Sequence, residues 1–184
     1  KFNVSQFGGW RHLYFLYPVV IVFSLSGYRF LLEFKFITKT KNLINLLILI
    51  NLIYILTWNY LNHPYQNVYF NFLSKKYAKN NFDLDYWGLS NINSLRYIIE
   101  NNNKFPIKVG SVSFTSLKVS KLMIDDQRKK DIVVVHDLND ADFLIDNYMK
   151  RVRNNFDIDK NIYKKYFEIV INGVPINTVY KKIN

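Results

Sequence analysis

The sequence predicts a membrane α-helical hairpin followed by a small α/β (or α+β) domain. Two long apolar segments lie in the first third of the chain, and few charges interrupt them. After His63 the apolar runs shorten, and helix and strand patterns alternate until a hairpin near the C-terminus. We therefore expect residues 1–62 to form the membrane part and residues 63–184 to form the α/β domain.

The two apolar segments have the length of membrane-spanning helices. The first, Leu13–Leu32, has Arg29 as its only charge, and the second, Leu43–Trp58, has none. Because about 20 apolar residues span the hydrocarbon core of a bilayer, we expect transmembrane helices at about 13–32 and 43–59. The competing interpretation is a helical hairpin buried in a soluble protein. Such helices usually carry a polar stripe at helical period, which the second segment lacks.

A short basic segment separates the two predicted helices. Residues 33–42 include Lys35, Lys39 and Lys41. Short segments rich in Lys and Arg stay in the cytoplasm. We therefore expect a cytoplasmic loop at 33–42, with the residues after about 60 on the opposite, extracytoplasmic side.

The composition excludes several classes of protein. The chain has no cysteine, which excludes a disulfide-stapled miniprotein, a thiolate zinc site and a cysteine nucleophile. Its formal net charge is +11, but Lys, Asn and Ile are frequent along the whole chain and Ala occurs only at positions 78 and 141. This pattern is typical of nucleotide bias in a genome rather than of one basic binding surface. We therefore expect no nucleic-acid partner.

Helices and strands alternate in the second part of the chain. Ser90–Asn101 begins with capping residues and has one apolar face, which predicts a helix, and Thr115–Met123 has apolar residues at helical spacing. Alternating or short apolar runs predict strands at Pro106–Val112, Ile132–Val135 and Ala141–Tyr148. This order of elements favours a small α/β or α+β domain.

The last part of the chain predicts a β-hairpin. Its arms are Phe167–Ile171 and Val174–Tyr180, joined by Asn172 and Gly173. Asn-Gly favours a type I′ turn because both turn positions need a positive φ. Pro175 has no backbone N–H for a neighbouring strand, so we expect this second arm at a sheet edge.

One candidate binding site precedes the first predicted membrane helix, at Trp10, Arg11 and His12. A guanidinium matches phosphate oxygens in a bidentate fork, so Arg11 and His12 are candidates for binding a lipid phosphate at the outer interface. The alternative is an anchor that only fixes the depth of the helix in the bilayer.

A second candidate lies in the motif at residues 83–88. Asp85, Tyr86 and Trp87 combine a carboxylate that accepts hydrogen bonds from sugar hydroxyls with an indole that stacks on a sugar. These residues and His63 are candidates for contacting an acceptor molecule or for a structural role. We favour the structural role for this motif, with the aromatic rings packed on the core and Asp85 capping the next helix.

His136, Asp137 and Asp140 follow a predicted strand, a position where acidic residues occur in many α/β active sites. The chain has neither G-x-S-x-G nor a glycine-rich phosphate loop. The other histidines, His12 and His63, are distant in sequence. We therefore expect no hydrolase active site in residues 63–184, no metal site and no cofactor.

Five stretches together resemble a known family. They are Trp10–Pro18, His63–Asn71, Phe82–Ser90, Ala141–Tyr148 and Asn172–Lys181. In order and spacing they resemble the C-terminal part of bacterial polytopic membrane glycosyltransferases of the GT-C type, such as protein-O-mannosyltransferases and aminoarabinose transferases. The resemblance covers nearly the whole chain.

This resemblance implies an enzyme of the bacterial inner membrane that transfers a sugar from a polyprenyl-phosphate donor on the extracytoplasmic side. It implies that Arg11 and His12 lie where a basic residue faces the donor phosphate. It also implies that the catalytic acid lies near the N-terminus of the full enzyme, outside this chain. The chain alone is then inactive, and its partners are the N-terminal remainder of the same protein, the polyprenyl-phosphate-linked sugar and the lipid bilayer.

The chain begins with Lys1 rather than Met, and we expect a fragment or a processed product. The competing function is a membrane-anchored extracytoplasmic binding or scaffolding module without catalytic activity. The coding sequence upstream of Lys1 distinguishes the two. Further apolar segments with an acidic residue in the first outer loop favour the transferase.

Overall fold

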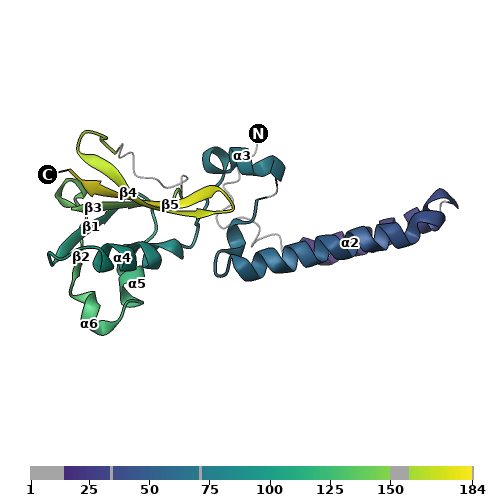
Figure 1. Ribbon diagram of the computed structural model, residues 1–184, viewed down its shortest axis with the longest axis horizontal. Coiled ribbons are helices and arrows are strands. Elements are labelled where there is room, and N and C mark those ends of the chain that lie inside the picture. The colour runs from purple at the N-terminus through teal and green to yellow at the C-terminus, as the bar shows by residue number, and fades with distance from the viewer. Residues whose placement is uncertain (1–14, 34, 71, 150–157, 184) are drawn as a thin grey trace. The chain divides into compact units, whose positions relative to one another are not determined.

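The chain divides into two units, Lys1–Trp58 and Asn59–Asn184 (Figure 1). The computed structural model describes residues 15–33, 35–70, 72–149 and 158–183. Within these ranges, the side chains of residues 35–39, 72–73, 79–80 and 126 are not described.

The first unit is built from α1 (Tyr17–Glu33) and most of α2 (Lys35–Leu61). The Tyr28 hydroxyl of α1 donates a 2.6 Å hydrogen bond to Asn45 Oδ1 of α2. Within α2, Thr40–Leu61 has a mean hydropathy of 1.7. It is the one helix of the described residues that is long and apolar enough to cross a membrane, by length and composition only. At 17 residues α1 is shorter, so one apolar helix rather than a membrane hairpin is established.

The basic segment predicted as a loop is helical instead. Because α2 begins at Lys35, residues 35–42 form its first turns, and the prediction of a loop over 33–42 is wrong. Residues 35–42 contain neither Gly nor Pro, and Lys is a good helix former. Nothing in this segment therefore ends a helix.

The second unit contains a five-stranded mixed sheet in the order β2-β1-β3-β5-β4. The central strand β1 (Ile107–Ser111) is parallel to β2 (Ile132–Val134) and to β3 (Phe143–Asp146). The long strand β5 (Val174–Lys182) is antiparallel to β3 and to β4 (Tyr163–Ile171). Strands lie in all the segments where the sequence predicts them, and an α/β domain is confirmed.

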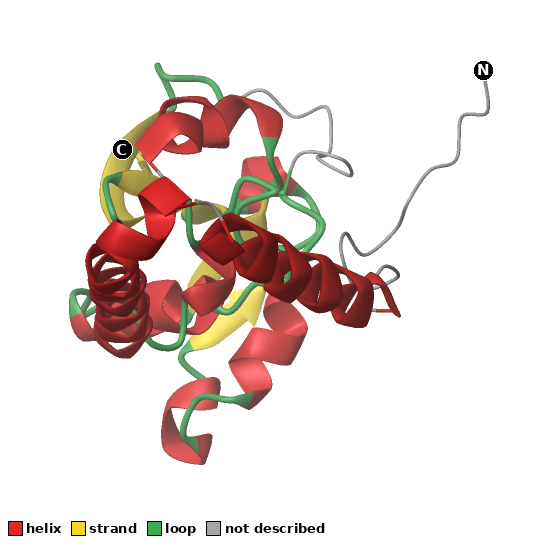
Figure 2. Ribbon diagram, turned by 90° about the vertical axis from the view of Figure 1, so that its right-hand side faces the viewer, coloured by secondary structure: helices red, strands yellow, loops and turns green. Residues whose placement is uncertain are grey.

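Helices α4 (Ser90–Glu100) and α5 (Leu117–Leu122) pack on one face of this sheet (Figure 1). Figure 2 shows the strands of this sheet in yellow. Ile98 of α4, Leu117 of α5 and Val109 of β1 share the main apolar core. All buried members of this core are Leu95, Ile98, Ile99, Ile107, Val109, Leu117, Ile124, Ile132, Phe143, Ile145 and Val179.

A smaller core lies around Gly110 of β1. There the short 3-10 helix η3 (Leu138–Asp140) brings Leu138 against Ala141 and Leu144. A Cβ atom at position 110 would lie 2.7 Å from a Leu138 methyl carbon. This close approach explains why glycine occupies that position in the strand.

The hairpin confirms the predicted turn but not the predicted place of its second arm. Asn172 and Gly173 have φ values of 49° and 75°, as a type I′ turn requires. Its second arm, β5, lies inside the sheet between β3 and β4, so the expectation of an edge strand is wrong. Pro175 is tolerated because β3 pairs only with residues from Thr178 onward. Beside Pro175, β4 is the one strand of the described residues that pairs with β5.

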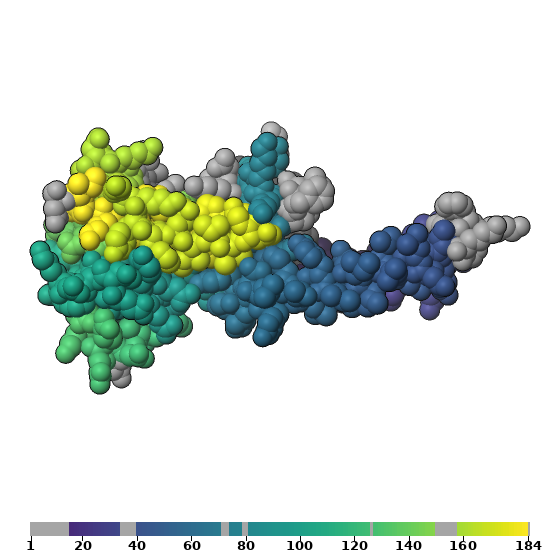
Figure 3. All heavy atoms as spheres, viewed as in Figure 1, coloured from purple at the N-terminus to yellow at the C-terminus, as the bar shows by residue number. Residues whose placement is uncertain are grey.

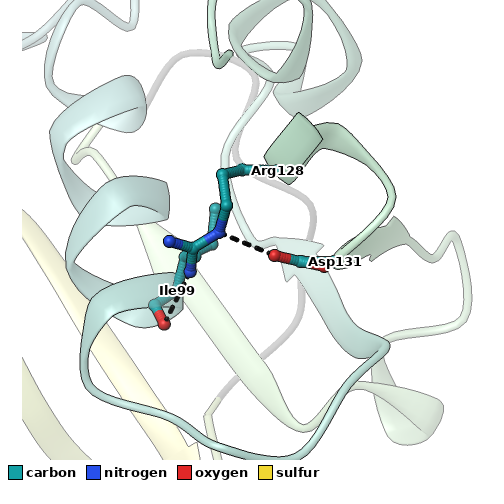
Figure 4. A network of polar contacts seen from close by, with 3 residues as sticks. All are labelled: Ile99, Arg128 and Asp131. Atoms are coloured by element: carbon teal, nitrogen blue, oxygen red, sulfur yellow. Dashed lines mark hydrogen bonds and ion pairs between the residues drawn. The ribbon is translucent and has the colours of Figure 1, made fainter. Parts of the chain in front are cut away.

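The remaining elements are α3 (Phe72–Asn81), α6 (Asp126–Lys129) and the 3-10 helix η2 (Gln66–Val68). Arg128 ties α6 to α4 (Figure 4). Its Nε lies 2.8 Å from Asp131 Oδ2, and its Nη2 donates a 3.3 Å bond to the Ile99 carbonyl oxygen. The guanidinium thus satisfies one of the carbonyl groups that the end of α4 leaves without a helical partner.

Candidate functional site at the carboxyl edge of the parallel strands

The carboxyl ends of β1, β2 and β3 meet at one edge of the sheet because these strands are parallel. From β1 the chain continues through α5 toward β2, which is one edge strand of the sheet. From β3 it continues toward β4, which is the opposite edge strand. In open α/β sheets, ligands bind at such a change of direction, outside the carboxyl ends of the strands. The residues that follow β1 and β3 are therefore candidates for a binding site.

The predicted motif at residues 83–88 lies against this edge. Asn147, which follows β3, donates a 2.8 Å bond from Nδ2 to the Asp85 carbonyl oxygen. Asn91 donates a 3.0 Å bond from Nδ2 to Oγ1 of Thr115, which follows β1. A Cβ atom at Gly88, whose φ is +67°, would lie 2.9 Å from Thr115 Cβ. The motif is thus held in contact with both strand ends.

Asp85 holds the beginning of α4. It is 1% exposed, and its carboxylate accepts bonds from the backbone N–H groups of Leu89 (3.0 Å) and Ser90 (2.8 Å) and from the Ser90 hydroxyl. Burial raises the pKa of Asp85, and the hydrogen bonds from Ser90 and Leu89 oppose that rise. The structure thus places Asp85 in a helix-capping position rather than on an open surface.

A buried polar network extends from Asp85 to the sheet. Asn177 of β5 donates from Nδ2 to the Ser90 hydroxyl oxygen (2.7 Å) and to Asn91 Oδ1 (3.0 Å). Its own Oδ1 accepts a 2.9 Å bond from the Ser94 hydroxyl. Sequence reasoning missed Asn177, because only its tertiary partners distinguish a buried asparagine from the many others in this chain. Through Asn91, the network reaches Thr115 at the strand edge.

Tyr86 and Trp87 form one wall of an aromatic hollow. Their rings meet edge to face with centroids 5.1 Å apart, and Trp87 is 61% exposed. Phe114, which follows β1 and is 66% exposed, lies in the same lining. This aromatic hollow has a volume of about 390 Å³. It offers flat apolar surfaces to a ligand.

A second hollow, of about 250 Å³, lies beside it and shares the lining residues Phe114, Thr115 and Ser116. Lys118 of α5 and His136 after β2 also line it. We name this the hydroxyl hollow for its other polar lining residues, which are Ser111, Ser113, Thr115 and Ser116. It joins an ammonium, an imidazole and several hydroxyls at the edge where ligands bind in this class of fold.

Lys118 and His136 touch each other. Lys118 Nζ lies 3.1 Å from His136 Nε2. Because an ammonium only donates hydrogen bonds, a bond from Lys118 takes Nε2 as its acceptor and leaves Nδ1 as the ring nitrogen that carries a proton. His136 can therefore accept from Lys118 and still offer one N–H group. The sequence predicted that His136 follows a strand, but it did not predict Lys118 as its partner.

The other residues singled out in the sequence lie elsewhere. Arg11 and His12 lie outside the described residues. His63 is exposed beyond the end of α2, with its Nδ1 2.8 Å from Gln66 Nε2, and it lines neither hollow. Asp137 accepts a bond from the Asn139 backbone N–H at the start of η3. Among the residues that the structure describes, no group of His, Asp and Glu is arranged to hold a metal ion.

Comparison with known proteins adds no identification. No protein-family model matches this chain, and no curated protein and no solved structure matches it. The resemblance to membrane glycosyltransferases therefore stays a prediction from the sequence.

Proposed function

We propose that this chain is a membrane-anchored module whose α/β domain binds a small ligand on the extracytoplasmic side. The observation that carries the anchor is the surface of α2. The consecutive residues Leu46–Ile50 are each more than half exposed. Because neighbouring residues of a helix are 100° apart, this exposed apolar surface surrounds the helix. Figure 3 shows the side chains of α2, in blue, at the surface along the helix.

A helix that is apolar on all sides is stable where a non-aqueous environment covers it. In a lipid bilayer such a helix needs no polar face. About 20 apolar residues are enough for it to span the hydrocarbon core. Thr40–Leu61 has 22 residues. The lysines at positions 35, 39 and 41 mark the beginning of α2, which favours the cytoplasm for that end and the opposite side for the α/β domain.

Membrane extraction tests the anchor. We expect the chain to stay in bacterial membranes washed with alkaline carbonate. We expect the double variant Leu49→Asp and Ile53→Asp to be released, because each charge at the centre of a membrane helix costs about 2.5–3.5 kcal/mol. A matched control places the same charges on exposed apolar residues of the α/β domain, Leu122→Asp and Met123→Asp, and should stay in the pellet. Release of the unmodified chain would contradict the proposal.

Cysteine labelling tests the side of the membrane, because the natural chain has no cysteine. Lys160→Cys places a thiol on an exposed loop of the α/β domain, and Lys41→Cys places one near the other end of α2. In intact cells, a membrane-impermeant maleimide should label Lys160→Cys and should label Lys41→Cys only after permeabilisation. The reverse pattern would place the α/β domain in the cytoplasm.

The sugar-transfer role is a second proposal, in which the chain is the C-terminal segment of a GT-C glycosyltransferase. It is favoured by the order of the five resembling stretches, and it takes the catalytic acid from outside this chain. The capping position of Asp85 is compatible with that view. We expect sugar transfer only when the upstream coding region is present, and expect Arg11→Ala to abolish it. A coding region that starts at Lys1 would contradict this proposal and leave the binding module.

A further inference from the structure

Among the described residues, no carboxylate balances the positive charge of Lys118 in the hydroxyl hollow. No acidic residue lines it, and in the part of the chain that the structure describes Lys118 forms no ion pair, its one polar partner being His136. The neighbouring Asp137 carboxylate accepts instead from the Asn139 backbone N–H. Since an ammonium has three N–H donors, Lys118 keeps donors for a ligand. An anion would balance its charge.

The hydroxyls of this hollow add a further donor. Ser111 donates to the Ser113 carbonyl oxygen at 2.8 Å, and the Ser113 and Thr115 hydroxyls share a 3.2 Å contact. Asn91 donates to Thr115 Oγ1, so Thr115 already accepts one bond. The Ser111 and Ser113 hydroxyls also lie 3.3 Å apart, so the three protons can all be used within this group. The Ser116 hydroxyl also lines the hollow and can donate to a bound oxygen.

The aromatic hollow continues from the same residues. Phe114, Thr115 and Ser116 belong to the lining of both hollows, so one small molecule can occupy the two together. The Phe114 and Trp87 rings are largely exposed, and covering apolar surface is favourable by about 25 cal/mol per Å². The ligand that fits has an anionic group at one end and a flat or ring-shaped body at the other.

We propose that the two hollows bind a small phosphate monoester, with its phosphate beside Lys118 and His136 and its ring on Phe114 and Trp87. A phosphate presents several oxygens, which suits donors that lie on different side chains, whereas a carboxylate presents only two. This inference rests on the proposed binding function, for which it names the ligand class. It requires no metal and no covalent step.

Calorimetric titration of the full chain tests this proposal. A neutral polyoxyethylene detergent is suitable because it has neither phosphate nor sugar groups. The probes are phenyl phosphate, inorganic phosphate and benzoate at low ionic strength. We expect phenyl phosphate to bind most tightly, inorganic phosphate less tightly and benzoate least.

Variants separate the two halves of the site. Lys118→Ala should weaken phenyl phosphate binding by about tenfold, and Lys118→Arg should retain it, because the lost interaction is a charge-assisted hydrogen bond. The matched control Lys76→Ala removes an exposed lysine of α3 and should change the affinity by less than about twofold. Phe114→Ala should lower the affinity for phenyl phosphate to that for inorganic phosphate, which should bind as before.

Three results would overturn the proposal. Absence of binding by all three probes would remove the ligand class. Equal losses from Lys118→Ala and Lys76→Ala would show attraction by net charge rather than a site, and benzoate binding as tight as phenyl phosphate would remove the preference for phosphate. The membrane and labelling experiments are independent of these titrations, so a failure of the ligand proposal is distinguishable from a failure of the membrane anchor.

Discussion

The apolar helix α2 and the α/β unit differ in the exposure of their side chains. Apolar side chains are exposed along α2, whereas the α/β unit buries both apolar side chains and some polar ones. In α2, Leu49 is 51% exposed, as are its neighbours to a similar extent. In the α/β unit, Leu95 is fully buried, and so is the polar Asn177, whose amide is hydrogen-bonded on both sides. This difference indicates that the two parts are adapted to different environments. The α/β unit buries its apolar side chains against one another, as a domain in water does, whereas α2 needs a covering that this chain's described residues do not supply.

The largest expected effect tests this contrast directly. Leu95→Ala should lower the free energy of unfolding of the α/β unit by about 2–5 kcal/mol, because a fully buried leucine leaves a cavity. Leu49→Ala should change it by less than about 0.5 kcal/mol, because this leucine contributes nothing to that core. Hydrogen exchange of the β1 and β3 amides, measured on the full chain in detergent, reports on the α/β unit alone. Equal effects of the two substitutions would show that the units are stabilised together.

A smaller effect is expected at the buried cap. Asp85→Asn should destabilise the α/β unit by about 1–3 kcal/mol near neutral pH, because an amide group cannot accept from Leu89, Ser90 and the Ser90 hydroxyl together. The same exchange measurement checks this value. Asp83→Asn, which removes a carboxylate from the same loop, is the matched control and should have a smaller effect.

The difference in stability between the wild-type chain and Asp85→Asn should depend on pH. Burial raises the pKa of Asp85 in the folded state, so the folded protein binds this proton more tightly than the unfolded chain does. The resulting stabilisation is complete below the unfolded pKa and is lost as the pH rises through the folded pKa. On acidification from about pH 6 to about pH 4, the wild-type chain should therefore gain stability relative to Asp85→Asn. A relative loss would mean that the hydrogen bonds outweigh burial and lower the pKa.

The smallest effect compares one glycine from each unit. Gly173→Ala should cost about 1–2 kcal/mol, because φ is +75° and an L side chain is strained there. The new Cβ would lie 3.0 Å from Lys75 Cε, at the flexible end of that side chain, which can move. A Cβ at Gly27 in α1 would meet no atom within 4 Å, so Gly27→Ala should leave the α/β unit unchanged. The same exchange measurement on both variants checks this difference.

Local patterns were sufficient to predict most of the elements. The apolar face of Ser90–Asn101 predicted α4, alternating or short apolar runs predicted β1, β2 and β3, and Asn172-Gly173 predicted the hairpin turn. These signals are local, because periodicity and turn residues act within a few positions. The loop predicted between the two apolar helices is wrong because lysine is a good helix former, so a basic segment can belong to a helix.

The candidate site was predicted only in part. His136 and the motif of Asp85 and Trp87 were singled out, but the hydroxyl hollow was not, and Lys118 was not distinguished from the other lysines. Contacts between β1, α5 and the segment after β2 join residues that are distant along the chain. Hydrophobic periodicity depends only on residues that are near one another in sequence, so it does not predict such contacts.

What the sequence determined by itself was the contrast between an apolar helix and a water-adapted α/β domain, because burial preference and periodicity are properties of single residues and their near neighbours. The tertiary structure decided the strand order, the interior place of β5 beside Pro175, and the burial of Asp85 and Asn177 in one network. It also decided that Lys118 meets His136. Those outcomes depend on which distant segments pair, and the free energy that selects a pairing is a sum over the whole domain.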